Sequence, residues 1–405
     1  MTTLPIPLLV SLLLGLISLA ILAAGFALLA RALSQSRRRR TEVRDWSEDL
    51  KRELPPAMKD VGSPNVVTRL LHDPGRRKML AGVALLGLTF FGRHIVQLGF
   101  AGGTDEPQQT RSGTVRTLLQ PDGTTIHVEE YGPPNGPTIV FTHGWGVSST
   151  EWYYAKRHLS DQFRLIVWDL PGLGLSGQPR DRDYAVEKMA SDLRAVLQLA
   201  EGRRAVLVGH SIGGMINLAF CRMYPDLISS SIAGIVQVDT TYTNPVRTTK
   251  NAGFSLAIQK PIAEPLLHAM VLLSPAVRVL NWLSYQNGFA QLYNAHSSFG
   301  GSETRGQVDF VSQFQYRSSP AVVARGTLGM FHWDATPALP HVNTPVLILV
   351  GDQDTTTLPA ASERMEQAIP RARLQRISSG AHYSLLEQNG TVDAAVAQFA
   401  SSVLK

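Results

Sequence analysis

From about residue 114 onward, short runs of apolar and β-branched residues alternate with stretches of helical periodicity. Several of these runs, such as TIVFT, FRLIVW and PVLILV, are almost continuously apolar and do not alternate with polar residues. Strands have this composition when both faces of their sheet are covered, as in parallel sheets flanked by helices. The sequence therefore predicts an α/β fold with a mostly parallel, doubly wound sheet.

The predicted helices lie between these runs, at 185–200, 212–224, 359–368 and 383–404. In doubly wound sheets, ligands bind beyond the carboxyl ends of the strands. Residues that carry chemistry are therefore expected directly after the apolar runs.

Residues 209–213, GHSIG, follow the run RAVLV and precede an apolar helical stretch. G-x-S-x-G at a strand-to-helix turn is typical of a nucleophilic serine, because small neighbours permit a sharp turn that exposes the hydroxyl. The helix start also favours developing negative charge. An ordinary glycine turn is the alternative. The position between a buried strand and a helix favours catalysis, so Ser211 is the predicted nucleophile.

A serine hydroxyl needs a base to take its proton. His382 ends a GAH segment after the last strand run, and Asp354 ends the GDQD segment after PVLILV. The order Ser211, Asp354, His382 differs from that of chymotrypsin-like and subtilisin-like enzymes and fits a serine at this kind of turn. Asp239 and Asp352 also follow apolar runs. Strand alternation would point Asp352 and Asp354 the same way, so spacing does not separate them.

The segment HGWG, residues 143–146, follows the run TIVFT. Acyl transfer develops an oxyanion, which two backbone N–H donors stabilise strongly. Ile212, directly after the serine, is predicted to supply one N–H, and Trp145 the other. His143 and His210 are expected to be structural residues.

The segment WDLPGLGLSG, residues 168–177, matches G-x-G-x-x-G, the loop that holds the pyrophosphate of a dinucleotide. In dinucleotide-binding folds a helix begins within the glycines. Here the polar stretch QPRDRD follows, and the next helix is expected only near residue 185. Asp192, near the distance of the ribose-binding acid, falls inside that helix. We therefore interpret the segment as a scaffold loop near the pocket.

The segments HGWG, DLPGLGLSG, GHSIGG, GDQD and GAH stand in the order and at the separations found in the α/β-hydrolase superfamily, which the chain resembles from about Val115 to its C-terminus. The resemblance implies an α/β-hydrolase fold with a helical cap, and an esterase-like or lipase-like activity. The glycine segment is similar to the family's D-x-x-G-x-G-x-S loop, with Asp169 and Ser176 as its first and last residues. Ser211 argues against haloalkane dehalogenases and epoxide hydrolases, whose nucleophile is aspartate.

The N-terminal part begins with 25 residues, Ile6 to Ala30, that carry no charge. This length suffices for a helix to cross a hydrocarbon core of about 30 Å. A cleaved signal peptide is the alternative, but no Lys or Arg precedes the run, and the run exceeds a usual signal core. Residues 1–35 are therefore predicted to be a transmembrane anchor. The basic residues Arg37–Arg40 after it indicate a cytoplasmic flank.

A second apolar run, within residues 79–101, is interrupted by Arg93 and His94. Basic residues precede it, so it is predicted either to cross the membrane from inside to outside or to form an interfacial or docked helix. Residues 36–78 between the two runs are expected to form a polar, basic loop. The catalytic domain is extracytoplasmic if the second run spans, and cytoplasmic if it does not.

The expected hydrolase core consists of residues 110–241 and 341–405, separated by a helical cap at 242–340. The cap has no strand rhythm and is rich in aromatic residues. Most of these are expected to pack the cap onto the core, and a few to line an apolar acyl site. A neighbouring membrane anchor favours a small-molecule ester of lipophilic character as the substrate.

The net charge of +6 at first suggests a nucleic-acid partner. However, residues 1–100 hold 14 basic and 7 acidic residues, whereas residues 101–405 hold 24 and 25. Proteins that bind nucleic acid contact its phosphate backbone with an excess of basic residues. The main domain is nearly neutral, so no nucleic-acid partner is expected. The single cysteine, Cys221, excludes an intramolecular disulfide framework.

The predicted mechanism is serine ester hydrolysis: His382 deprotonates Ser211, Asp354 supports the imidazolium, and water resolves the acyl-enzyme. The same three residues would also serve acyl transfer, or thioester, C–C bond or peroxy-acid chemistry. A catalytically silent binding protein on the same fold is a further alternative. The sequence implies no cofactor and no metal.

Overall fold

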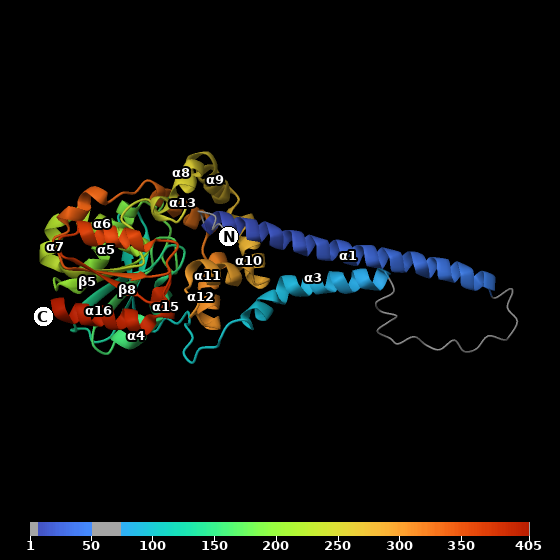
Figure 1. Cartoon of the computed structure of the whole chain (residues 1–405), viewed down its shortest axis with the longest axis horizontal. Coiled ribbons are helices and arrows are strands. Elements are labelled where there is room, and N and C mark those ends of the chain that lie inside the picture. The colour runs from blue at the N-terminus through green and yellow to red at the C-terminus, as the bar shows by residue number, and fades with distance from the viewer. Residues whose placement is uncertain (1–6, 51–73, 405) are drawn as a thin grey trace.

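The computed structural model describes residues 7–50 and 74–404 of the chain. A rounded α/β domain carries two long N-terminal helices that project from one end of it (Figure 1). The C-terminus lies at the opposite end of the domain.

One eight-stranded sheet forms the centre of the domain, in the order β1-β2-β4-β3-β5-β6-β7-β8. β2 pairs antiparallel with β1 and β4, and the remaining neighbours are parallel. The strands are β1 (Thr114–Leu119), β2 (Thr125–Tyr131), β3 (Thr138–Thr142), β4 (Arg164–Trp168), β5 (Ala205–His210), β6 (Ile232–Val238), β7 (Val346–Gly351) and β8 (Ala372–Ile377). This sheet confirms the predicted α/β-hydrolase fold.

The five central strands, β3 to β7, are buried at every residue, which explains their continuous apolar composition. Two apolar clusters lie on the two faces of the sheet. The first includes residues of α5 (Val186–Leu197), α6 (Ile212–Met223) and α14 (Pro359–Ala368). The second includes residues of α4 (Tyr153–Leu159) and α16 (Asn389–Val403). The carboxyl edge of the sheet remains available for a site.

Helices fill the segment between β6 and β7, which we call the cap. They are η3 (Pro245–Thr248), α8 (Ala252–Ile258), η4 (Gln259–Ala263), α9 (Glu264–Leu272), α10 (Ser274–Gln286), α11 (Phe289–Ser298), α12 (Arg305–Arg317), α13 (Pro320–Phe331) and η5 (Thr336–His341). A third apolar cluster, which includes Leu267, Val277 and Phe331, packs these helices together. The short helices α7 (Pro225–Ser231) and α15 (Ser384–Glu387) complete the core.

Two N-terminal helices are long and apolar enough to cross a membrane: α1 (Pro7–Leu50), through its part Val10–Ser36, and α3 (Pro74–Gln97). α1 continues well past the predicted end of the anchor at residue 35, because residues 36–50 contain no Pro or Gly that would stop a helix. The predicted breaks at 55–56 and 62–64 lie outside the described residues.

Glycines bring α1 and α3 together. A Cβ on Gly25 would lie 2.9 Å from a methyl carbon of Leu86, and a Cβ on Gly82 would lie 3.0 Å from the carbonyl oxygen of Gly25. Small residues at such a contact allow close approach of two backbones, as in helix pairs within membranes. α1 and α3 therefore form a hairpin that returns the chain to the domain (Figure 1).

Candidate active site

Ser211 occupies the sharp turn between β5 and α6. Its φ of 51° and ψ of −117° lie outside the usual regions for a residue with a side chain. A Cβ on Gly209 would lie 2.3 Å from the carbonyl carbon of Gly213, and a Cβ on Gly213 would lie 2.3 Å from the carbonyl oxygen of Thr142. Only glycine fits at these two positions, so the G-x-S-x-G spacing is a packing requirement of the turn.

Gly213→Ala is expected to destabilise the protein by at least about 1–3 kcal/mol, because the new methyl group meets backbone that cannot move aside. Gly390→Ala is the matched control, since no atom lies within 4 Å of a Cβ at Gly390. Thermal unfolding of both variants in detergent micelles measures the effect. Equal midpoints for the two variants would contradict this account of the turn.

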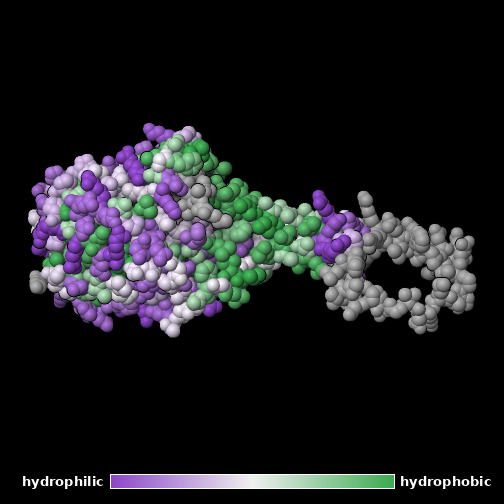
Figure 2. Space-filling model, in the orientation of Figure 1, coloured by the Kyte–Doolittle hydropathy of each residue, from purple (hydrophilic) through white to green (hydrophobic). Residues whose placement is uncertain are grey.

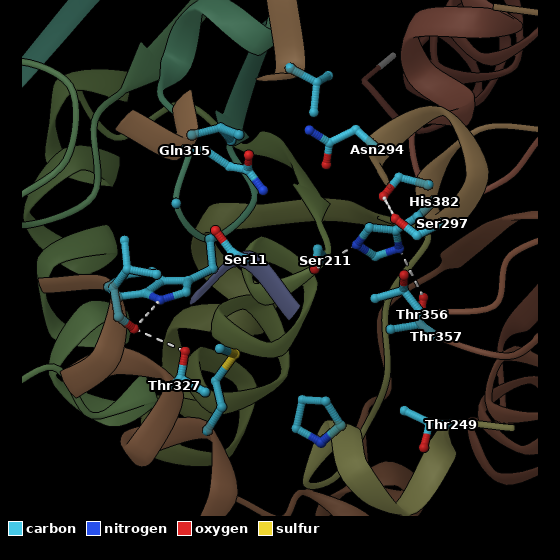
Figure 3. Close-up of a pocket in the computed structure, with 18 of the residues that line it drawn as sticks. Ser11, Ser211, Thr249, Asn294, Ser297, Gln315, Thr327, Thr356, Thr357 and His382 are labelled. Atoms are coloured by element: carbon cyan, nitrogen blue, oxygen red, sulfur yellow. Dashed lines mark hydrogen bonds between the residues drawn. The ribbon is translucent and has the colours of Figure 1, made fainter. Parts of the chain in front are cut away.

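The structure brings the three predicted polar residues together at the carboxyl edge of the sheet. His382 Nε2 lies 3.2 Å from Ser211 Oγ, and His382 Nδ1 lies 3.0 Å from Asp354 Oδ2. His382 follows β8 and Asp354 follows β7, as the sequence predicts. Figure 3 shows the imidazole of His382 between Ser211 and the loop of Thr357. Nδ1 donates to the carboxylate, and Nε2 is left to accept the serine proton.

Asp354 is buried and well supplied with hydrogen-bond donors. Thr357 Oγ1 donates to its Oδ2 at 2.6 Å, and the backbone N–H groups of Thr356 and Thr357 donate to its Oδ1 at 2.7 and 3.0 Å. Burial alone would raise the pKa of this carboxyl, but the charge of His382 and these hydrogen bonds lower it below its usual value. Asp354 is therefore held as a carboxylate.

The other two aspartates take different places. Asp352 is exposed and Asp354 is buried, so the expected same-side orientation is wrong. The reason is that β7 ends at Gly351, and strand alternation does not continue into the turn. Asp239 accepts a hydrogen bond from the N–H of Gly351 at 2.8 Å and another from the Ser384 hydroxyl. Burial and the neighbouring Asp354 carboxylate raise the pKa of Asp239 well above its usual value.

This raised pKa gives Asp239 a pH-dependent effect on stability. The folded protein keeps the proton where the unfolded chain loses it, so the stabilisation is complete below about pH 4 and is lost as the pH rises. Asp239→Asn carries an amide that does not titrate. We expect its unfolding midpoint, relative to wild type, to rise by about 2 °C or more between pH 5 and pH 8. A pH-independent difference in scanning calorimetry would contradict this assignment.

The two predicted oxyanion donors come from the start of α6 and from the loop after β3. Ile212 is the first residue of α6, so its N–H has no partner within the helix. Trp145 lies in the loop after β3, and its indole N–H donates to the carbonyl oxygen of Val323 at 2.9 Å. His143 Nε2 accepts from the N–H of Leu170 at 2.9 Å, so His143 fixes this loop, in keeping with the structural role expected for it.

A cavity of about 310 Å³ opens onto Ser211 and His382. Apolar side chains from the core and the cap form much of its wall: Trp145, Met215, Tyr293, Phe314, Val323 and Phe331. Asn294 and Gln315 lie on one side of the cavity, and Ser11, from α1, also lines it (Figure 3). The cavity therefore accepts a largely apolar molecule next to the serine hydroxyl.

Comparison with protein families decides the assignment of this arrangement. The family model described as the alpha/beta hydrolase fold matches residues 137–388, which include Ser211, Asp354 and His382. The chain belongs to the alpha/beta hydrolase fold family. The match covers the cap and the part of the core from β3 to α15, and it begins after the two N-terminal helices.

Several relatives of this hydrolase are esterases. Pimeloyl-[acyl-carrier protein] methyl ester esterase of Nitrosomonas europaea is 28% identical over 260 residues, which are 62% of this chain and 89% of that protein. An uncharacterised protein of Mycobacterium tuberculosis is 37% identical over 98 residues, so the chain matches only 28% of its length. The structure of a thermophilic esterase from Thermogutta terrifontis has a TM-score of 0.58 and 25% identity, and covers 73% of this chain and 100% of its own. These relatives support a hydrolase of the esterase kind.

A buried network that the sequence did not reveal connects the loop after β3, which holds the predicted oxyanion donor Trp145, to His382. Glu151 accepts a hydrogen bond from the N–H of Gly144 at 3.0 Å and lies 2.9 Å from His210 Nδ1. His210 Nε2 donates to the carbonyl oxygen of His382 at 2.8 Å. Burial lowers the pKa of His210, but the Glu151 carboxylate raises it further, to above its usual value. The network ties both sides of the site to the buried contact between Glu151 and His210.

The glycine segment acts as a scaffold in this hydrolase. Asp169 Oδ2 accepts from the N–H of Leu175 at 2.8 Å, and its Oδ1 accepts from the N–H of Ser149 at 2.8 Å. Gly174 has a φ of +54°, and a Cβ there would lie 2.2 Å from the Asp169 carboxylate. The glycine therefore lets the loop fold back onto its own aspartate, and no helix starts within 172–177.

Proposed function

We propose that the chain is a serine hydrolase that cleaves carboxylic esters through Ser211, His382 and Asp354. The observation that carries the proposal is the continuous hydrogen-bonded line from Ser211 Oγ through the imidazole to the buried carboxylate, at 3.2 and 3.0 Å. This line ends at a serine whose strained turn points it into the cavity. The esterase relatives agree with this chemistry.

In the proposed reaction, His382 Nε2 takes the hydroxyl proton as Ser211 Oγ attacks the carbonyl carbon of the ester. The carbonyl oxygen becomes an oxyanion, which the N–H groups of Ile212 and Trp145 stabilise. His382 then gives the proton to the leaving alcohol. A water molecule, deprotonated by the same imidazole, resolves the acyl-enzyme, while Asp354 stabilises the imidazolium in both half-reactions.

We further propose that the hydrolase is membrane-anchored and acts on a lipophilic ester. The apolar cavity wall and the two helices of membrane-spanning length support this assignment. Both helices have most of their basic residues at the end far from the domain: Arg31 and Arg37–Arg40 follow the apolar part of α1, and residues 76–78 open α3, whereas Arg93 lies at the end near the cap. Since basic flanks stay in the cytoplasm, this arrangement favours an extracytoplasmic catalytic domain.

A fluorophosphonate probe tests the nucleophile directly in the full-length protein in detergent micelles. We expect one probe per chain, attached to Ser211 in peptide mass spectrometry, and loss of labelling after heat denaturation. A label on another serine, or no label on a protein that hydrolyses esters, would contradict the assignment. Product analysis with competing alcohol, thiol or peroxide separates hydrolysis from acyl transfer and peroxy-acid chemistry. Protease digestion of intact cells tests the side of the membrane.

A further inference from the structure

The cap exposes far more apolar surface than the core does. Among the described residues, 8 large exposed hydrophobic side chains belong to the cap and only 3 to the core. Seven of the eight lie between the start of α8 and the end of α10. Trp282 packs near Phe90 of α3, and we call the other six the cap apolar face: Phe254, Leu256, Ile262, Leu272, Leu273 and Val279. Leu272 and Leu273, at the bend between α9 and α10, are 82% and 58% exposed. A patch of this kind marks a contact with a partner or a membrane.

The cap apolar face continues onto the helix hairpin. Figure 2 shows the hydrophobic colour running without a break from the projecting helices onto the adjoining end of the domain. The helical segments 252–272 and 274–286, which meet at a bend of 99°, are together long and apolar enough for a broken membrane segment. This continuity favours the same surroundings for the cap apolar face and for the helix hairpin.

Specific contacts fix the cap against the hairpin. Ser11 Oγ donates to Asn281 Oδ1 at 3.1 Å, and Asn287 Nδ2 donates to Ser18 Oγ at 2.7 Å. A Cβ on Gly15 would lie 2.6 Å from Leu280 Cβ, so α1 and α10 touch closely between these two bonds. The depth of α10 in a bilayer is therefore set by the depth at which α1 lies.

Helix length places this contact relative to the bilayer. At a rise of about 1.5 Å per residue, a hydrocarbon core of about 30 Å takes about 20 residues of helix. Counted back from Arg31, this distance reaches Ser11; counted forward from Lys78, it reaches Leu98, next to the end of α3. The stretch 11–18 that contacts α10 then lies within the leaflet on the side of the catalytic domain.

The polar residues agree with such a depth. Arg93, in the outer part of α3, donates to the hydroxyl of Tyr285 in α10 at 2.6 Å, which leads its charge toward the cap and away from lipid. Residues 242–298 of the cap carry 4 basic residues and 1 acidic residue. A surface that combines Leu, Phe and Lys or Arg is typical of helices that lie in the interface of a membrane.

We propose that the cap apolar face is immersed in the leaflet next to the catalytic domain, so that the cavity takes its ester from the lipid phase. The bilayer is the partner of this surface. Ser11 connects the bilayer with the cavity, because it lies at the expected edge of the hydrocarbon core and also lines the cavity onto which Ser211 opens. The choice of a lipid-phase ester rests on the proposed function; immersion of the cap does not.

Immersion is tested by spin labelling, which needs no catalysis. Cys221 is the single cysteine and is buried, so a nitroxide attaches selectively to Leu272→Cys or to the control Ser401→Cys. Ser401 is exposed near the C-terminus, at the end opposite the hairpin. In vesicles of phosphatidylcholine and phosphatidylglycerol, we expect oxygen to relax the label at 272 and a water-soluble nickel complex to relax the label at 401. Relaxation of the 272 label by nickel, as at 401, would overturn the proposal.

Entry from the lipid phase is tested by turnover. We expect Leu272→Glu/Leu273→Glu to cleave methylumbelliferyl oleate dissolved in the same vesicles about tenfold or more slowly than wild type. Soluble methylumbelliferyl acetate should be cleaved at the wild-type rate, and the control Ser401→Glu/Ser402→Glu should match wild type on both esters. Unchanged oleate turnover in the Leu272/Leu273 variant would overturn lipid-phase entry. Failure of the wild type on both esters would instead contradict the proposed function, and would leave the spin-label result standing.

Discussion

Ser211→Ala is expected to lower kcat/KM for ester hydrolysis by about 10⁴-fold or more. The alanine removes the hydroxyl oxygen that lies 3.2 Å from His382 Nε2, so no acyl-enzyme forms. The cavity and the predicted oxyanion donors stay in place. Residual hydrolysis above the uncatalysed rate should therefore persist, through substrate binding and oxyanion stabilisation.

Ser297→Ala is the matched control for Ser211→Ala, because Ser297 also lines the cavity but its hydroxyl lies 3.1 Å from that of the neighbouring Ser298 and takes no part in the Ser211–His382 contact. Steady-state hydrolysis of a soluble acetate ester should show wild-type behaviour within about threefold for this control. If Ser211→Ala keeps more than a small fraction of wild-type turnover, another group is the nucleophile.

Asp354→Asn is expected to lower kcat by about 10³–10⁴-fold with little change in KM. Its side chain fills the same space, but it carries no charge to stabilise the imidazolium. The amide can also present N–H to His382 Nδ1, which favours the tautomer that cannot accept the serine proton. The hydrogen bonds from Thr356 and Thr357 to the side-chain oxygen can remain, so the fold should be preserved.

Asp239→Asn provides the comparison for Asp354→Asn, since both aspartates are buried at neighbouring strand ends. Asp239 meets Gly351 and Ser384 instead of His382, so its amide variant should keep kcat within about threefold. The pair is measured by kcat and KM over a pH series. Equal losses in both variants would show that the two carboxyl groups act as one unit.

Most strands and the three candidate site residues could be predicted, because their signals lie in short stretches of sequence. β3 to β7 are almost continuously apolar, and Ser211, Asp354 and His382 each lie within a few residues of the end of one strand. β1 escaped prediction because it is an edge strand whose residues, such as Val115 and Leu119, are largely exposed. A strand with both faces exposed shows neither a continuous apolar run nor an alternation of apolar and polar residues in its sequence.

Contacts between distant segments could not be predicted in the same way. Glu151 lies in the short helix η1 (Ser149–Trp152), where nothing in the neighbouring residues marks it as a partner of His210. The bond between Ser11 and Asn281 joins an apolar helix to the cap, and each residue taken alone resembles an ordinary helix position. The turn after β7 exposes Asp352 and buries Asp354, and the geometry of this turn depends on hydrogen bonds to the distant residues Asp239 and Gly380.

The bond between Ser11 and Asn281 also has a consequence for biosynthesis, because its two residues are 270 positions apart. A ribosome that adds about 5–20 residues per second needs about 15–50 s to synthesise that interval. During this time α1 already exists, but its partner helix α10 does not. Until α10 is synthesised, α1 and α3 have to stay together through their own contact, which includes Gly25 and Gly82. During this time Ser11 and Ser18 lack the cap residues that bond to their hydroxyl groups in the folded protein.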